Sequence, residues 1–167
     1  TYLEGKGKVQ RARSQKWNPM RVNARLVQGD KVRIGKDSRA EIFTFDADTI
    51  RLSENTELEI NHLQKNPVRE TKKKKLFLSL GRMWNRAKTL LHSKSEYTVR
   101  TPNAISGIRG TAYNIDVSSE HATKIKTYSG AVKVWQPTAS KEPKRGWKLS
   151  APTVVSGPHA VSVKQWK

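Results

Sequence analysis

The sequence contains no cysteine and, in 167 residues, only 14 acidic ones. Without cysteine the chain can form neither disulfide bonds nor a thiolate nucleophile, and it cannot ligate zinc through sulfur. No apolar run approaches the roughly 18 residues that a membrane-spanning helix needs. Apolar residues amount to only 35%, which favours an all-β structure with one face of each strand in water over a thick α/β core.

The sequence also lacks the motifs of the common catalytic sites. The four histidines, His62, His92, His121 and His159, are far apart, and none forms the His-x-x-x-His spacing of a zinc site. There is no Gly-x-Ser-x-Gly nucleophile turn and no phosphate-binding loop that combines glycines with a lysine. We therefore predict that the chain is not an enzyme and has no catalytic residue, no metal site and no cofactor.

The charge of the chain is strongly one-sided, with 33 Lys and Arg residues and a formal net charge of +19. This excess is larger than solubility requires, so an anionic neighbour is expected. Nucleic acid, an acidic cell-wall or surface polymer, anionic lipid and an acidic protein are all candidates, and composition does not rank them.

Short alternating strands separated by turn-forming residues dominate the pattern. Between residues 29 and 63, apolar residues alternate with polar ones around Val32, Ile42, Ile50 and Leu58. Strands spaced roughly 8 to 10 residues apart predict an all-β fold of short stacked strands, either a β-solenoid or a twisted sandwich. The only helix we allow is a short one within residues 82–92, where apolar residues fall at helical spacing.

One domain is expected from residue 1 to residue 135. Residues 136–151 are rich in Pro, Ser and Lys and predict an exposed basic loop. Residues 152–167 regain valines at regular spacing, so we expect a C-terminal capping strand there, with a plain extension as the alternative. Because the chain begins at Thr1 without a methionine, we also expect a processed or truncated N-terminus.

The segment Thr101-Pro-Asn-Ala-Ile-Ser-Gly-Ile-Arg-Gly-Thr111 is the centre of the chain's organisation. Its Thr-Pro pair favours an extended backbone, and Gly107 and Gly110 flank an Ile-Arg pair, which predicts a strand, a corner and a second strand. Arg109 lies in that corner among isoleucines. Its guanidinium is therefore expected to hold a carboxylate or backbone carbonyls rather than a ligand.

The pattern Thr-Pro-x-Ala-x-x-Gly-x-Arg-Gly-Thr-x-Tyr, from residue 101 to residue 113, resembles the core signature of the FecR-like domain family. Gly29-Asp30 and the Val-Lys-Val run after Gly130 agree with the family pattern, and the resemblance extends from Val9 to Trp135. It implies a non-enzymatic β domain of the bacterial cell envelope, periplasmic or extracellular. The chain is similar to the stand-alone, secreted members, so we expect a scaffold or binding module that contacts protein partners or an anionic polymer.

The resemblance also implies which residues belong to the structural signature. They are Gly107, Arg109, Gly110, Thr111, Gly29 and Asp30. Arg109 is expected to pair with Asp30, because both belong to the same family pattern.

The most electropositive segment runs from Thr71 to Ser95 and holds eight basic residues and no acid. Clustered like charge repels itself within a fold, so this segment is expected to contact an anionic partner. We expect that partner to be an envelope protein assembly or an acidic cell-wall or surface polymer. The residues expected to make the contact are Lys72, Lys73, Lys74, Lys75, Arg82, Arg86 and Lys88.

Nucleic-acid binding through the same basic segments is the alternative function. Stacking of bases would use the five tryptophans, which are Trp17, Trp84, Trp135, Trp147 and Trp166. No known reader motif accompanies them, and tryptophans scattered through a β chain belong more often to the core.

Overall fold

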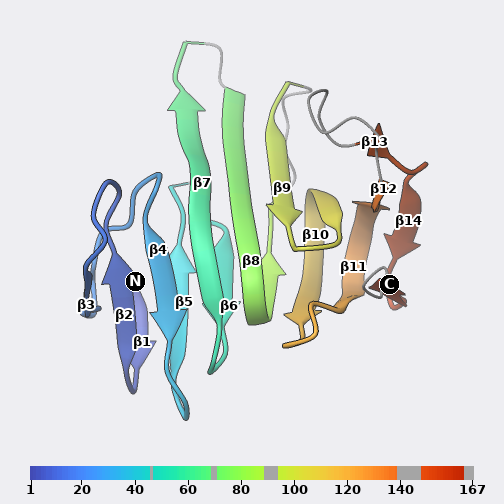
Figure 1. Ribbon diagram of the computed structural model, residues 1–167. Coiled ribbons are helices and arrows are strands. Elements are labelled where there is room, and N and C mark those ends of the chain that lie inside the picture. Colours follow the sequence, from blue (N-terminus) through green and yellow to red (C-terminus); the bar gives the residue numbers. More distant parts are fainter. Residues whose placement is uncertain (46, 69–70, 89–93, 139–147, 164–167) are drawn as a thin grey trace.

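The computed structural model describes residues 1–45, 47–68, 71–88, 94–138 and 148–163, and every regular element in these ranges is a β-strand (Figure 1). The all-β prediction is confirmed. The strands are β1 (Tyr2–Glu4), β2 (Gly7–Gln10), β3 (Trp17–Pro19), β4 (Lys31–Ile34), β5 (Arg39–Phe43), β6 (Thr49–Leu52), β7 (Glu57–Asn66), β8 (Thr71–Arg86), β9 (Glu96–Arg100), β10 (Ile105–Val117), β11 (Thr123–Trp135), β12 (Pro137–Thr138), β13 (Lys148–Leu149), β14 (Thr153–Ser156) and β15 (Ala160–Val163).

The prediction of a short helix within residues 82–92 is wrong for those of its residues that the structure describes. Residues 82–86 continue β8 as a strand, because β10 pairs with residues 81–86 on one side and β6 pairs with residues 83–86 on the other. Two flanking strands give the backbone N–H and C=O groups partners that a helix would have had to supply internally. Residues 89–93 lie outside the described residues.

Three long strands, β8, β10 and β11, each belong to two groups of strands. The first part of β8 pairs with β7 and, in parallel, with β9, whereas its last part pairs with β6 and β10. Likewise β10 pairs first with β9 and then with β8, and β11 pairs first with β15 and then with β14. We call the group with β2, β3, β4, β7, β9 and β14 the first layer, and the group with β1, β5, β6 and β15 the second layer.

Each long strand contains one glycine with positive φ between its two parts, at 89° in Gly81, 61° in Gly110 and 75° in Gly130. A Cβ on Gly81 would lie 2.5 Å from the Cα of Thr56, and one on Gly130 would lie 2.4 Å from the carbonyl oxygen of Gly110. Glycine tolerates both the backbone angle and the close approach. The long strands therefore bend from one layer to the other without ending.

This bend replaces the corner that we expected around Arg109. Residues 105–117 form one continuous strand, in which the pairing with β11 shifts register between Arg109 and Ala112. Such a shift is a β-bulge, which bends a strand and keeps it in the sheet. The prediction of two strands separated by a corner is therefore wrong.

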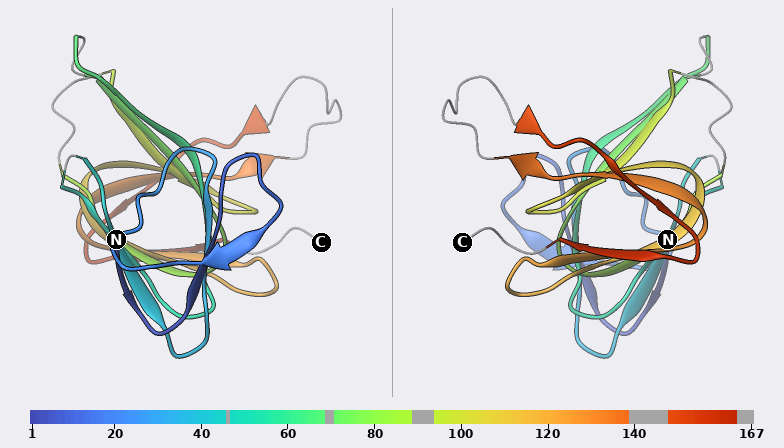
Figure 2. Two further views of the ribbon diagram at one scale, coloured as in Figure 1. Left: turned by 90° about the vertical axis from the view of Figure 1, so that its left-hand side faces the viewer. Right: turned by 90° about the vertical axis from the view of Figure 1, so that its right-hand side faces the viewer.

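The solenoid alternative is also wrong. Neighbouring strands are antiparallel except for β8 and β9, and thirteen of them join into one open sheet. The views in Figure 2 show this sheet curving back on itself rather than coiling in stacked turns. Of the two expected architectures, the structure is closer to the twisted sandwich.

Side chains that alternate along each strand form the core between the two layers. Val32, Ile34 and Leu58 come from the first layer, Ile50 and Leu52 from the second, and each is 3% exposed or less. Burying one such side chain stabilises the fold by about 1.5 to 3 kcal/mol. The period of two that predicted strands therefore also selects which residues enter the core.

The C-terminal segment adds strands to both layers through β11. β14 pairs with residues 131–134, and β15 pairs with residues 123–126. The segment expected to be an exposed loop, 136–151, begins and ends in the two-stranded pair of β12 and β13. Residues 139–147 and 164–167 lie outside the described residues.

Three polar side chains from β8, β9 and β10 form hydrogen bonds with one another inside the core. The side-chain amide of Asn85 in β8 donates hydrogen bonds to the hydroxyl oxygens of Tyr97 in β9 and, at 3.1 Å, of Tyr113 in β10. Burial, together with the nearby Tyr97, raises the pKa of the Tyr113 phenol well above its usual value. The phenol is thus kept neutral inside the protein, because a buried phenolate would lack solvation.

We predict that alkaline pH destabilises the protein through Tyr113. Its pKa is raised on folding, so its contribution to stability is constant below about pH 10 and is lost as the pH rises further, when the unfolded phenol ionises. Urea unfolding at increasing pH should show a shallower loss of stability in Tyr113→Phe than in the wild type. The control Tyr128→Phe removes a phenol that is 48% exposed and should follow the wild-type slope. Equal slopes for all three proteins would contradict the prediction.

Candidate functional site: a cationic outer face

The structure divides the seven predicted contact residues between two places. Lys72–Lys75 lie in the first part of β8, and Arg82 and Arg86 lie in its last part, with Lys88 just beyond the strand. At about 3.3 Å per residue, Lys73 and Arg82 are roughly 30 Å apart along the strand. The two groups therefore belong to different surfaces.

Lys74 does not face solvent, so its expected contact with an anionic partner is wrong. Its side chain lies on the core side of β8 together with those of Leu76 and Leu78, and it is only 1% exposed. The ammonium group pairs with the buried carboxylate of Asp48, which also accepts a hydrogen bond of 2.8 Å from the backbone N–H of Lys88. The lysine is thus part of a buried ion pair.

Acids from other strands neutralise part of the acid-free segment. Lys75 lies 3.2 Å from Glu96 of β9, and Arg82 pairs with Asp116 of β10. The absence of acids between residues 71 and 95 therefore does not make the surface around these residues uniformly positive, because pairing across strands supplies the missing carboxylates.

Arg82 and Arg86 lie on the outer face of the second layer with Trp84 between them. Cross-strand pairing places Arg51 of β6 on one side of Trp84 and Asn114 of β10 on the other. The guanidinium carbon of Arg51 is 4.8 Å from the centre of the Trp84 ring, a cation–π distance. Three arginines from two strands therefore surround one half-buried tryptophan.

The same outer face continues onto β11. Lys126 pairs across strands with Asn114, and Lys124 with Asp116. Lys126 also lies 5.1 Å from the ring of the exposed Tyr128. We call this surface the cationic outer face, and its residues are Arg51, Arg82, Trp84, Arg86, Asn114, Lys124, Lys126 and Tyr128.

Two acids interrupt the cationic outer face. Glu41 lies 2.6 Å from the Nε of Arg51. The hydrogen bond from Arg82 to Asp116 raises the pKa of the guanidinium above its usual value. In the described part of the chain, Arg86, Lys124 and Lys126 form no ion pair with an acid. These three cations remain available to an acidic partner.

The sequence predicted Arg82 and Arg86 as contact residues but not Arg51, Lys124 or Lys126. The strand alternation of residues 123–127 does indicate that Lys124 and Lys126 share one face. No local pattern shows that this face continues through Trp84 to Arg51, because the pairing joins residues far apart in the sequence.

The signature residues around β10 lie in structural positions. Gly107 lies under the Trp135 indole, since a Cβ on this glycine would be 2.8 Å from the ring. The hydroxyl of the buried Thr111 donates a 3.0 Å hydrogen bond to the carbonyl of Ala131 in β11. The hydroxyl of Thr123 donates a 2.5 Å hydrogen bond to the amide oxygen of Asn103 and lies 2.8 Å from the hydroxyl of Thr101. This part of the signature joins β9, β10 and β11.

The expected ion pair between Arg109 and Asp30 is wrong. Asp30 is fully buried and pairs instead with Arg11 at 2.7 Å, and it accepts hydrogen bonds from the backbone N–H groups of Ala12 and Val27. Arg109 is exposed on β10. Pairing of β2 with β4 places Arg11, the residue after β2, next to the start of β4. The sequence pattern did not contain this relationship.

In the described ranges, no three His, Asp or Glu side chains are arranged to hold a metal ion. Nor does any helical segment there have the length and apolarity that crossing a membrane requires.

Comparison with known proteins shows a shared fold and then the family. Two crystal structures of a protein from Parabacteroides distasonis ATCC 8503, described as a candidate anti-sigma factor, share the fold with a TM-score of 0.54 at 12% identity. The match covers 81% of this chain and 59% of that protein, so the chain spans less than two thirds of its length. No curated protein sequence is significantly similar.

The family model described as FecR protein matches residues 30–133, which is more than half of the chain. The chain belongs to the FecR protein family, and the resemblance inferred from the signature is confirmed. The match leaves out residues 9–29 and 134–135, which we had expected it to include. Membership in this family supports a regulatory or signalling module without catalysis as the general class of function.

We predict that Lys74→Ser strongly destabilises the protein, whereas Lys73→Ser does not. Removing Lys74 leaves the carboxylate of Asp48 buried without its cation, which costs about 3 to 5 kcal/mol. Lys73 is exposed, and its replacement should change the free energy of unfolding by less than about 0.5 kcal/mol. Urea unfolding measures both, and the double variant Lys74→Met, Asp48→Asn should recover part of the loss. Equal midpoints for the two single variants would refute the buried pair.

We also predict that Arg109→Ala has little effect on stability and that Arg11→Ala has a larger one. Arg11 donates a charge-assisted hydrogen bond to the buried Asp30, and its loss should cost about 1.5 to 3 kcal/mol. Arg109 is exposed, so its removal should cost less than about 0.5 kcal/mol. Thermal unfolding of both variants, measured side by side, tests this order. A larger loss of stability in Arg109→Ala than in Arg11→Ala would contradict the prediction.

Proposed function

We propose that the chain is a regulatory binding module of the bacterial cell envelope, periplasmic or extracellular, that binds an acidic protein through its cationic outer face. The observation that carries this proposal is the position of Trp84 among Arg51, Arg82 and Arg86. Tryptophan and arginine are the residue types that most often dominate the energy of protein interfaces.

The acids within the face favour a protein over a uniformly charged polymer. Glu41 and Asp116 lie beside Arg51 and Arg82. A nucleic acid or polyanionic chain laid across this surface would bring its own negative charges against these carboxylates. A protein surface can instead place cations opposite them and acids opposite Arg86.

Preorganisation of the side chains supports binding through this face. Arg51 is held by both Glu41 and the Trp84 ring. Arg82 is held by Asp116, which also accepts a 2.5 Å hydrogen bond from the amide of Asn114. Side chains already fixed in the free protein lose less conformational entropy on binding.

Membership in the FecR family and the likeness to a candidate anti-sigma factor support a regulatory role. The formal charge of +19 supports an acidic partner. Binding of nucleic acid by the same face is the alternative that the experiment must separate.

The test reverses charge on the cationic outer face. The variant Lys124→Glu, Lys126→Glu should bind a short peptide rich in Glu and Leu at least about 10-fold more weakly than the wild type, because like charges then oppose each other. The control Lys16→Glu, Lys36→Glu makes the same change of net charge at exposed residues outside this face and should weaken binding far less. Calorimetric titration measures the affinity of each protein.

Two parallel titrations distinguish the classes of partner. Duplex DNA and polygalacturonate are titrated over a series of salt concentrations. Tighter binding of DNA, with a steep fall in log affinity against log salt, would favour the nucleic-acid alternative. Tighter binding of polygalacturonate would favour an acidic polymer. Equal losses in the test and control variants would overturn the assignment to the cationic outer face.

A further inference from the structure

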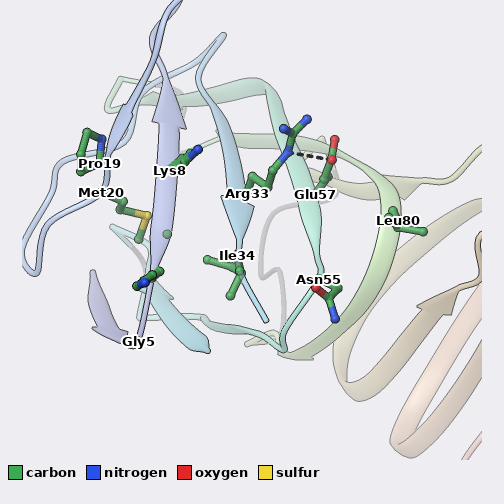
Figure 3. Close-up of a pocket in the computed structure, with 12 residues that line it drawn as sticks. Gly5, Lys8, Pro19, Met20, Arg33, Ile34, Asn55, Glu57 and Leu80 are labelled. Atoms are coloured by element: carbon green, nitrogen blue, oxygen red, sulfur yellow. Dashed lines mark ion pairs between the residues drawn. The ribbon is translucent and has the colours of Figure 1, made fainter. Parts of the chain in front are cut away.

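A pocket with a volume of about 610 Å³ lies beside β2, β3 and β4 (Figure 3), and none of its lining residues belongs to the cationic outer face. This volume is within the roughly 300 to 1,000 Å³ of small-molecule sites. The pocket is lined by Gly5, Lys6, Gly7, Lys8, Pro19, Met20, Arg33, Ile34, Gly35, Asn55, Glu57 and Leu80. We propose that it binds a small ligand in which a carboxylate is attached to an apolar body.

The apolar part of the lining comes from four side chains. Pro19 and Met20 belong to β3 and the residue after it, Ile34 ends β4, and Leu80 lies in β8. Pro19 and Leu80 have surface open to water, which an apolar ligand body would cover, and this favours binding. Met20 and Ile34, 5% and 1% exposed, belong to the core behind them.

One cation of the pocket is fixed in place. The Nε of Arg33 lies 2.8 Å from a carboxylate oxygen of Glu57, as Figure 3 shows, and its guanidinium carbon lies 4.6 Å from the centre of the Trp17 ring. In the described part of the structure, the two terminal nitrogens of Arg33 have no hydrogen-bond partner. A planar guanidinium with two free nitrogens is suited to bind a carboxylate through both of its oxygens.

The other charged residues of the pocket reinforce a preference for an anion. Lys8 of β2 pairs across strands with Arg33, and Lys6 precedes β2 by one residue. Both lysines are exposed. The lining thus holds three cations and one carboxylate, Glu57, which Arg33 already neutralises. A single ligand carboxylate therefore meets a net positive environment.

This charge pattern favours one class of ligand, but two kinds of compound belong to that class. A fatty acid and the free C-terminus of an apolar peptide both present one carboxylate on an apolar body. The polar amide of Asn55 lies in the same lining and can hydrogen-bond a peptide group, which a fatty acid lacks. Parallel titrations with the two compounds separate the sources.

The first experiment uses the unaltered protein with three probes: octanoate, octanamide and N-acetyl-Leu-Leu. The two carboxylates differ in their apolar body, and octanamide keeps the body of octanoate without its charge. At least one carboxylate should bind at least about 10-fold more tightly than octanamide, because the amide cannot form the charge-assisted pair with Arg33. Calorimetry gives the affinities, and amide chemical shifts of the pocket residues identify the site.

The second experiment compares two variants of β4. Arg33→Gln should weaken carboxylate binding at least about 10-fold, because it removes the planar cation. Lys31→Gln removes the neighbouring cation, which pairs with Glu59 on the same face at 3.5 Å but does not line the pocket. This matched control breaks an exposed ion pair of little energetic value and should change the affinity less than about 2-fold.

Three results would overturn the proposal. One is equal affinity for octanoate, N-acetyl-Leu-Leu and octanamide. Another is equal loss of affinity in Arg33→Gln and Lys31→Gln, and the third is the absence of binding by either carboxylate. These results leave the proposed function of the cationic outer face unaffected, because the two sites share no residue.

Discussion

The fold depends on the ability of β8, β10 and β11 to pass from one layer to the other at a left-handed glycine. Gly81, Gly110 and Gly130 each lie where a long strand changes partners. A side chain at Gly81 or Gly130 would collide with a neighbouring backbone. Because the strands bend without ending, the hydrogen-bonded ladder is continuous and one core lies between the layers. The positions of both proposed binding sites follow from this arrangement.

The same arrangement decides how the charge of the chain is distributed. On the outer face of the first layer, Lys31 and Arg33 pair with Glu59 and Glu57 across one ladder. On the second layer, β11 carries Lys124 and Lys126 without acid partners in the described ranges. The net charge of +19 is therefore not evenly spread. It is partly neutralised beside the pocket and left open on the cationic outer face.

Local patterns in the sequence predicted much of the secondary structure but not the fate of each charge. The alternation around Leu76 and Leu78 predicted a strand, and that strand was found. The same alternation directs Lys74 inward, yet a lysine in a run of four gives no sign of burial until Asp48 is known to lie opposite it. The predicted ion pair of Arg109 with Asp30 was wrong for a related reason, because Asp30 was chosen from a family pattern rather than from strand pairing.

By itself the sequence determined the all-β class, the family signature around Thr101–Thr111 and the excess of positive charge. These properties follow from periodicity, residue types and composition, all of which are local or additive. Only the tertiary structure decided that Arg51, Trp84 and Lys126 share one surface, and that Arg33 is fixed in the lining of a pocket. The physical reason is that strand pairing joins residues far apart in the chain, and its register is set by the packing of the whole core.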